Sequence, residues 1–162
     1  MSDAIVRAAL KWSLQKADFE RDGSLRDIYV QNATIDDWKL VIASIQRGGY
    51  GAQLHRGGVE VALPASIESL FVPDGRPYMN FTVAGVALDC HFFTPTEIEF
   101  SSDPQEVTEH SLHGLLAFMI NLGNVTSKPV IMTPENNSQS PILRYEPSQQ
   151  SLSWLSPTNS TR

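Results

Sequence analysis

The sequence contains a single cysteine, Cys90, and it has neither a long apolar run nor a cluster of basic residues. A lone thiol cannot close an internal disulfide, which argues against a secreted fold built on disulfide bridges. No run approaches the roughly 18 apolar residues of a membrane span, and the N-terminal residues do not resemble a secretion signal. Phosphate binding needs clustered basic side chains, whereas the 12 Lys and Arg residues are scattered. We therefore expect a cytoplasmic protein that binds neither membranes nor nucleic acid.

A signature for catalysis, metal binding or nucleotide binding is also lacking. Cys90 and His91 are adjacent, so strand alternation places them on opposite faces, with Cys90 in the core. His110 and His113 share a helix face, but a zinc site needs a second pair of ligands that the spacing does not supply. The sequence predicts no catalytic residue, no metal ligand and no cofactor.

Acidic residues are present, and they are unevenly distributed. The formal net charge is −6; residues 82–162 carry eight acids against three bases, whereas residues 1–81 carry ten against nine. Residues 89–109 contain six carboxylates and neither Lys nor Arg. A one-sided field of this kind affects the choice of partner and the rate of encounter, and it says little about the fold.

The length of 162 residues is typical of one domain. We place this domain at residues 1–150. Residues 151–162 read as a polar tail, which we expect to fray, with Trp154 docked on the body of the protein.

Apolar residues with helical spacing predict three main helices. The first covers residues 3–17. The second follows Thr34, whose hydroxyl can cap the backbone N–H three residues on, and ends at Gly48. Asp103 opens the last helix or the turn before it, and Gly123 is the expected stop. A shorter helix is expected at residues 64–71.

Alternating residues predict the strands. Residues 26–31, two hairpins at 50–63 and 78–93, a short strand at 97–100, and two final strands flanking the polar loop 133–140 all fit this pattern. In the strands between residues 78 and 100, the apolar side chains share one face and the acidic ones share the other. The prediction is an α+β domain with a largely antiparallel sheet and helices packed on one face.

Three segments resemble known proteins: GSLRDIYVQNATIDDW at 23–38, CHFFTPTEIEF at 90–100, and KPVIMTPENNSQSPILRYEP at 128–147. Together they look like small, uncharacterised bacterial α+β domains that occur as stand-alone cytoplasmic proteins, some of which resemble immunity proteins that neutralise a toxin. The resemblance implies a compact α+β domain, and it supplies no site residue.

The leading hypothesis is a non-enzymatic protein-binding domain that presents an acidic sheet face to a more basic protein, as an immunity protein or inhibitor would. The predicted binding residues are Asp89, His91, Glu97, Glu99, Asp103, Glu106 and Glu135.

Two alternatives stay open. The first is a small enzyme or ligand-binding domain that uses His91, Glu97 and Glu99, with the loop near Glu135; it predicts a concave pocket and a carboxylate whose pKa is raised. The second is a structural homodimer joined through sheet edges or the Trp154 tail.

Overall fold

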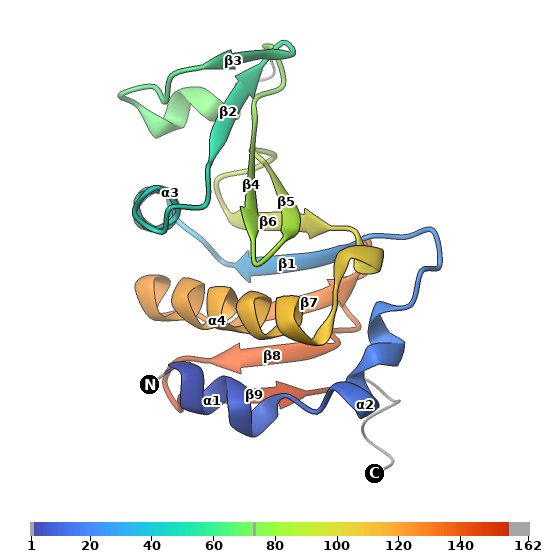
Figure 1. Ribbon diagram of the computed structural model, residues 1–162. Helices are drawn as coiled ribbons and strands as arrows, with labels where there is room; N and C mark the ends of the chain where they lie inside the picture. Colours follow the sequence, from blue (N-terminus) through green and yellow to red (C-terminus); the bar gives the residue numbers. More distant parts are fainter. Residues whose placement is uncertain (1, 73, 156–162) are drawn as a thin grey trace.

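The computed structural model describes residues 2–72 and 74–155. It contains one antiparallel sheet in the order β3-β2-β4-β5-β6-β1-β7-β8-β9. The strands are β1 (Arg26–Gln31), β2 (Gln53–Arg56), β3 (Val59–Val61), β4 (Tyr78–Val83), β5 (Val86–His91), β6 (Glu97–Ser102), β7 (Val130–Pro134), β8 (Leu143–Glu146) and β9 (Ser151–Trp154). In Figure 1, β2 and β4 run upright while β1, β7 and β8 run across the view, so the sheet is strongly twisted.

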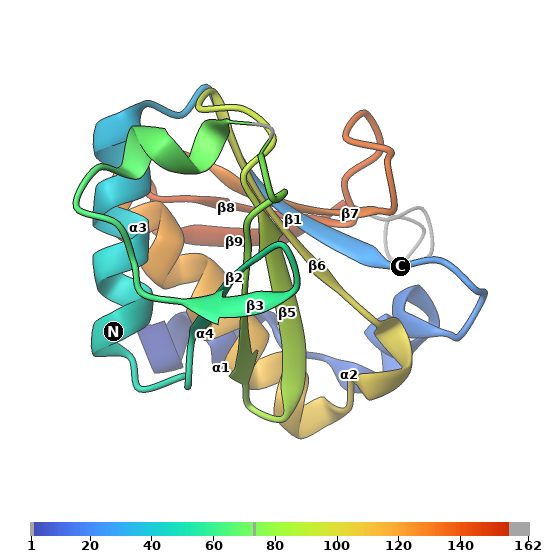
Figure 2. The same ribbon diagram turned by 90° about the horizontal axis from the view of Figure 1, so that it is seen from above.

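The helices lie on one face of this sheet, as predicted. They are α1 (Ser2–Ala9), α2 (Trp12–Gln15), α3 (Ile35–Arg47) and α4 (Glu109–Thr126), with short 3₁₀ turns η1 (Lys16–Phe19), η2 (Ile67–Phe71) and η3 (Pro104–Glu106). Figure 2 shows α1, α3 and α4 together on one side, and the loop between β7 and β8 projecting on the other. The α+β class with a largely antiparallel sheet is confirmed.

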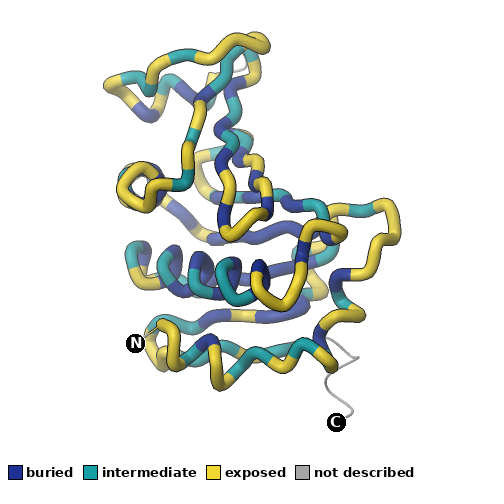
Figure 3. The backbone as a smooth tube through the Cα atoms, in the orientation of Figure 1, coloured by how far each residue is buried: buried dark blue, intermediate teal, exposed yellow. Residues whose placement is uncertain are grey.

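Helix α4 lies at the centre of the core. Its side chains Leu112, Leu115 and Leu116 are completely buried. Phe118 of the same helix packs against Phe81 and Phe100 of the sheet, with ring centroids 5.6 and 5.4 Å apart. Figure 3 shows the resulting buried layer along α4, β1 and β7.

Helix α3 follows its sequence signals closely. The hydroxyl of Thr34 accepts a hydrogen bond from the backbone N–H of Asp37, and the Asp37 carboxylate accepts one from the N–H of Thr34. This reciprocal cap fixes the start of the helix. Trp38, Val41 and Ile45 then face the core.

The first helix is shorter than predicted. It ends at Ala9, and α2 begins at Trp12, because side chains compete for the backbone at this point. The side chain of Gln15 donates to the carbonyl of Ala9 and accepts from the N–H of Lys11. The indole of Trp154 donates to the same carbonyl. A single helix over residues 3–17 is therefore wrong.

Two further boundaries differ from the prediction. Helix α4 runs past Gly123 to Thr126 and ends at Ser127, which has a left-handed conformation. Gly123 instead makes room for the ring of Tyr145. Residues 151–154, which we placed in the polar tail, form strand β9 beside β8; residues 156–162 of that tail lie outside the described residues. No helix in the described part of the chain is long and apolar enough to cross a membrane.

Candidate binding face

The face of the sheet opposite the helices is called here the uncovered face. It consists of the strand residues whose side chains alternate away from α1, α3 and α4. Strand pairing sets them in rows, because Asn80 lies opposite Asp89, Asp89 opposite Ser101, and Ser101 opposite Asp27. The acidic members of this face are Asp27, Glu60, Asp89, Glu97, Glu99 and Glu146; Arg144 of β8 is a basic member. The predicted acidic sheet face therefore has a physical counterpart.

Part of this face holds a buried polar cluster. The carboxylate of Asp27 accepts hydrogen bonds from the hydroxyl of Ser101 at 3.0 Å and from the backbone N–H of Asn136 at 3.0 Å. The hydroxyl of Tyr29 lies 3.2 Å from Oδ2 of Asp27 and 3.1 Å from Oε1 of Glu99. Asp27 and Tyr29 are almost fully buried, and Glu99 is half-buried. Burial, followed by the nearby charge of Asp27, raises the pKa of Glu99.

The loop between β7 and β8 folds against the uncovered face and helps to bury this cluster. Its residue Asn136 donates to Asp27, and the carboxylate of Glu135 accepts a hydrogen bond of 2.7 Å from the N–H of Leu25. Glu135 also donates its own N–H to the carbonyl of Leu25. Glu135 therefore fastens the loop to the start of β1, and its carboxylate already has a hydrogen-bond partner within the protein.

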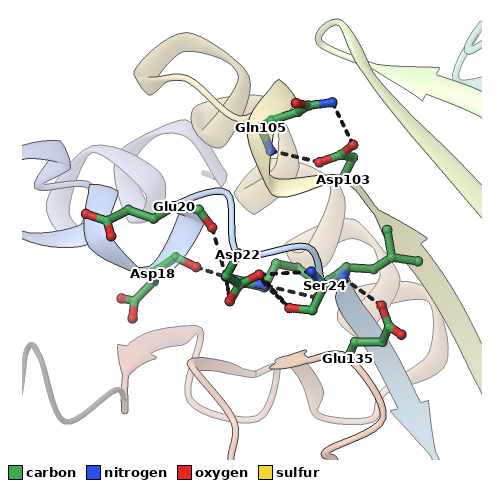
Figure 4. Close-up of polar contacts among 9 residues, drawn as sticks. Asp18, Glu20, Asp22, Ser24, Asp103, Gln105 and Glu135 are labelled. Atoms are coloured by element: carbon green, nitrogen blue, oxygen red, sulfur yellow. Dashed lines mark hydrogen bonds and ion pairs between the residues drawn. The ribbon is translucent and has the colours of Figure 1, made fainter.

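Other acids gather at the same end of the sheet, where Figure 4 shows Asp18, Asp22, Asp103 and Glu135 around the start of β1. The guanidinium of Arg26, which is buried, binds Asp22 and donates to the backbone carbonyl of Asp18. The hydrogen bonds of Ser24, reinforced by Arg26, hold the pKa of Asp22 well below its usual range. This network shapes the loop that leads into β1.

Asp103 and Glu106 also satisfy backbone groups. Asp103 caps the 3₁₀ turn η3 by accepting from the N–H of Gln105 at 3.0 Å. Glu106 accepts from the N–H of Ala87 at 3.3 Å, at the start of β5. Two of the six carboxylates at residues 89–109 are thus explained by a cap and a backbone anchor, because each replaces a missing backbone partner.

Asp89 and Glu97 are different. Neither carboxylate accepts a hydrogen bond from any residue in the ranges 2–72 and 74–155. Asp89 is exposed in the middle of β5, and Glu97 is half-buried at the start of β6. Among the predicted acidic binding residues, these are the two whose carboxylates make no hydrogen bond or ion pair with the described residues.

The other end of the uncovered face carries a column of stacked rings. His55 stacks on Tyr78 with ring centroids 4.9 Å apart, Tyr78 lies 5.6 Å from His91, and His91 stacks on Phe93 at 5.1 Å. The column ends at Phe93, which is 69% exposed. An exposed Phe at the end of an ordered stack offers a ready surface for an apolar or planar group.

This column borders a concave site, called here the aromatic hollow. It is formed by residues 57–58, 71–72, 75–78 and 91–93 and has a volume of about 920 Å³. The aromatic rings of Phe71, Tyr78, Phe92 and Phe93 contribute to its wall, together with His91 and Arg76. Its walls are therefore mostly apolar, with a few polar groups.

The aromatic hollow meets only some of the requirements of the enzyme alternative. His91 lines it, as that alternative requires, and Glu99 has the raised pKa that it predicts. However, Glu97 and Glu99 are not among the lining residues, and Glu99 is bound to Tyr29 instead. The structure thus does not bring the three residues together in one concave site.

The remaining histidine and cysteine candidates have ordinary surroundings. Cys90 is buried on the core side of β5, where burial raises the pKa of its thiol. His113 contacts Asp3 of α1 at 3.0 Å, and His110 is exposed. No group of three His, Cys, Asp or Glu side chains within the described ranges is placed to hold a metal ion.

The aromatic end of the face and the buried cluster were not predicted from the sequence. The sequence places Tyr78 and Phe93 in a predicted hairpin, and Asp27 and Tyr29 in a predicted strand, and none of the four is among the predicted binding residues. The pairing of Tyr78 with His91 could have been predicted from the sequence, because the two-residue turn at Ala84 and Gly85 fixes the register of this hairpin. The burial of Asp27 could not be predicted from the sequence, because it depends on a loop more than 100 residues away.

No protein-family model, no curated protein and no solved structure matches this chain. What the protein binds is therefore inferred from the chemistry of its surface.

Proposed function

We propose that this protein is a cytoplasmic bacterial protein-binding domain, and that its partner is a more basic protein that docks on the uncovered face. The observation that carries the proposal is that the carboxylates of Asp89 and Glu97 have no hydrogen-bond partner among the described residues. Both lie on the uncovered face, and neither accepts a hydrogen bond from the described residues, whereas Asp22, Asp103, Glu106 and Glu135 all do. Carboxylates without internal partners are free to pair with Lys or Arg of another protein.

The surroundings of these two acids suit an interface. Charge on the face steers a basic partner and speeds the encounter, while affinity comes mainly from a few well-packed aromatic anchors. The exposed ring of Phe93 and the aromatic hollow, which Tyr78 and His91 of the uncovered face help to line, supply such an anchoring region. Inhibition of a basic toxin, in the manner of an immunity protein, is the most specific form of this proposal.

The test is capture of partners from host lysate at low and at moderate salt by wild-type protein and by Asp89→Lys/Glu97→Lys. Glu99 is left unchanged, because its hydrogen bond to Tyr29 makes any replacement a structural change as well. We expect wild type to retain one stoichiometric basic protein that is released as salt rises, and the double variant to lose it.

A matched control separates the face from the overall charge. Asp36→Lys/Glu109→Lys changes the net charge by the same amount, but both positions are exposed on the helix layer. This variant should capture the partner like wild type. Unchanged capture by the Asp89→Lys/Glu97→Lys variant, with its thermal unfolding intact, would contradict the proposal.

Binding of a small molecule in the aromatic hollow is the second candidate. Its volume of about 920 Å³ is near the upper end of the roughly 300–1,000 Å³ range of ligand pockets. Arg76 and His91 give it polar groups that favour an aromatic ligand with acceptor atoms. Mass spectrometry of the native protein purified from its host tests this candidate, because a small ligand would be carried at one equivalent. The homodimer alternative stays a prediction, which light scattering at two concentrations would test.

A further inference from the structure

The turn that connects β5 to β6 separates two recesses. Phe92 and Phe93 line the aromatic hollow on one side of it. The next residue, Thr94, lines a second recess of about 380 Å³, called here the polar recess. Its other lining residues are Gln31, Asn32, Thr96 and Glu97. Because Phe93 and Thr94 are consecutive, a short segment of a partner can reach both recesses at once.

The turn between the recesses is held firmly. Thr94 pairs with Glu97 across it, and the hydroxyls of Thr94 and Thr96 lie 3.0 Å apart. The carbonyl of Thr96 accepts a hydrogen bond of 2.8 Å from the N–H of Ala33, which ties the turn to the segment after β1. The two recesses therefore have a fixed spacing, which favours recognition of a defined motif.

The charges decide which group enters which recess. The polar recess contains the Glu97 carboxylate, amide oxygens and hydroxyls, and no basic side chain among its lining residues. It is thus suited to a cation. The aromatic hollow contains Arg76 and no carboxylate among its lining residues, so a cation is disfavoured there and an aromatic ring is favoured.

We propose that the partner presents an aromatic residue to the aromatic hollow and an arginine, one to three positions away, to the polar recess. This inference rests on the proposed function, because it specifies the partner of the same face. Arginine is favoured over lysine because its planar guanidinium can pair with Glu97 while it stacks against the exposed ring of Phe93. The stacked column from His55 to Phe93 fixes that ring in place before the partner arrives.

The test is an NMR titration of the full-length ¹⁵N-labelled chain with short capped peptides: Trp-Arg, Trp-Gly-Arg and Trp-Gly-Gly-Arg. At least one of them should shift the amide signals of residues 91–94 together with those of 31, 32 and 97. Replacing Arg by Glu, or Trp by Ala, in the best peptide should weaken binding by about tenfold. Signals that stay unchanged up to the solubility limit of the peptides, or that shift mainly on α1, α3 and α4, would overturn the proposal.

Two substitutions sharpen the result. Phe93→Ala should weaken binding of the best peptide by about tenfold, whereas Leu40→Ala, which truncates another exposed apolar side chain on α3, should leave it unchanged. Glu97→Gln should weaken binding of the Arg peptide but not binding of its Glu counterpart. Glu109→Gln, at an exposed position on α4 away from the uncovered face, is the matched control for the lost charge. A Trp peptide that binds without regard to Arg or to Glu97 would make the hollow a small-ligand site and overturn the two-recess motif.

The two proposals fail in different ways. If Asp89→Lys/Glu97→Lys loses its protein partner while the peptides do not bind, the face is an interface and the aromatic–arginine motif is wrong. If the Asp89→Lys/Glu97→Lys variant keeps its protein partner, the proposed docking of a basic protein on the acidic face is wrong, whether or not the peptides bind.

Discussion

The hydroxyl of Tyr29 lies between two carboxylates, 3.2 Å from Asp27 and 3.1 Å from Glu99. A phenol has one proton, so it can donate to only one of them at a time. Asp27 also accepts from Ser101 and Asn136, which makes it the natural acceptor of the Tyr29 proton. Glu99 then faces a lone pair of the phenol oxygen unless it carries a proton of its own, and burial together with the charge of Asp27 raises the pKa of this carboxyl.

Glu99→Gln should therefore stabilise the protein at neutral pH. The amide can donate to the Tyr29 oxygen while Tyr29 donates to Asp27, and no charge is buried at position 99. The expected gain in the free energy of unfolding is about 1 kcal/mol at pH 7, measured by urea denaturation.

The pH dependence checks the cause of this gain. Because the pKa of Glu99 is raised in the folded state, its contribution to stability is present below the unfolded pKa of about 4.3 and is lost as pH rises through the folded value. The advantage of Glu99→Gln over wild type should therefore grow from pH 4 to pH 7. A constant difference over that interval would show that the proton on Glu99 plays no part.

Tyr29→Phe should have the opposite effect. It removes a donor from the nearly inaccessible carboxylate of Asp27, and the expected loss of stability is about 1–3 kcal/mol. Tyr50→Phe is the matched control, because no hydrogen bond to the Tyr50 hydroxyl is found among the residues that the structure describes. The control should change the free energy of unfolding by less than about 0.5 kcal/mol. Equal losses in the two variants would mean that the hydroxyl of Tyr29 is not a stabilising donor.

Local signals were sufficient to predict α3 and the hairpin of β4 and β5. The Thr34 cap and the apolar spacing from Trp38 to Ile45 both depend on neighbours within one or two helical turns. In the hairpin, strict alternation and a two-residue turn specify the face of each side chain. These elements formed as predicted because tertiary contacts reinforce the local preference.

Contacts between distant residues explain what could not be predicted. The carbonyl of Ala9, where α1 ends, accepts a hydrogen bond from the indole of Trp154, 145 residues later in the chain. The half-buried state of Glu99 depends on Tyr29, 70 residues away. For the candidate site, the sequence placed Asp89, His91 and Glu97 on one sheet face, and it predicted a capping role for Asp103. It could not separate the first group from Glu106 and Glu135, because only the structure shows that these two carboxylates already bind a backbone N–H.

Asp37 offers a second test of a carboxylate with two partners. It accepts from the N–H of Thr34 at 2.9 Å and from the ammonium of Lys128 at 2.6 Å, which joins the start of α3 to the segment after α4. Asp37→Asn keeps the shape but removes the charge, and we expect a loss of about 1–3 kcal/mol in the free energy of unfolding. The neighbouring Asp36, whose side chain is 90% exposed, provides the control Asp36→Asn, which should cost less than about 0.5 kcal/mol. Comparable losses at both positions would indicate a general effect of charge at the helix start.

Gly123 tests the packing of α4 against β8. Alanine is the better helix former by about 1 kcal/mol, so propensity alone predicts that Gly123→Ala stabilises the protein. A Cβ at this position would lie 2.5 Å from Cδ2 and 2.7 Å from Cε2 of Tyr145, whose ring is completely buried and cannot move aside. We expect a net loss of about 1–3 kcal/mol. In a Tyr145→Ala background the steric conflict is gone, and Gly123→Ala should become neutral or stabilising by up to about 1 kcal/mol. A loss that persists in that background would place its cause in the backbone around Gly123 and not in the ring of Tyr145.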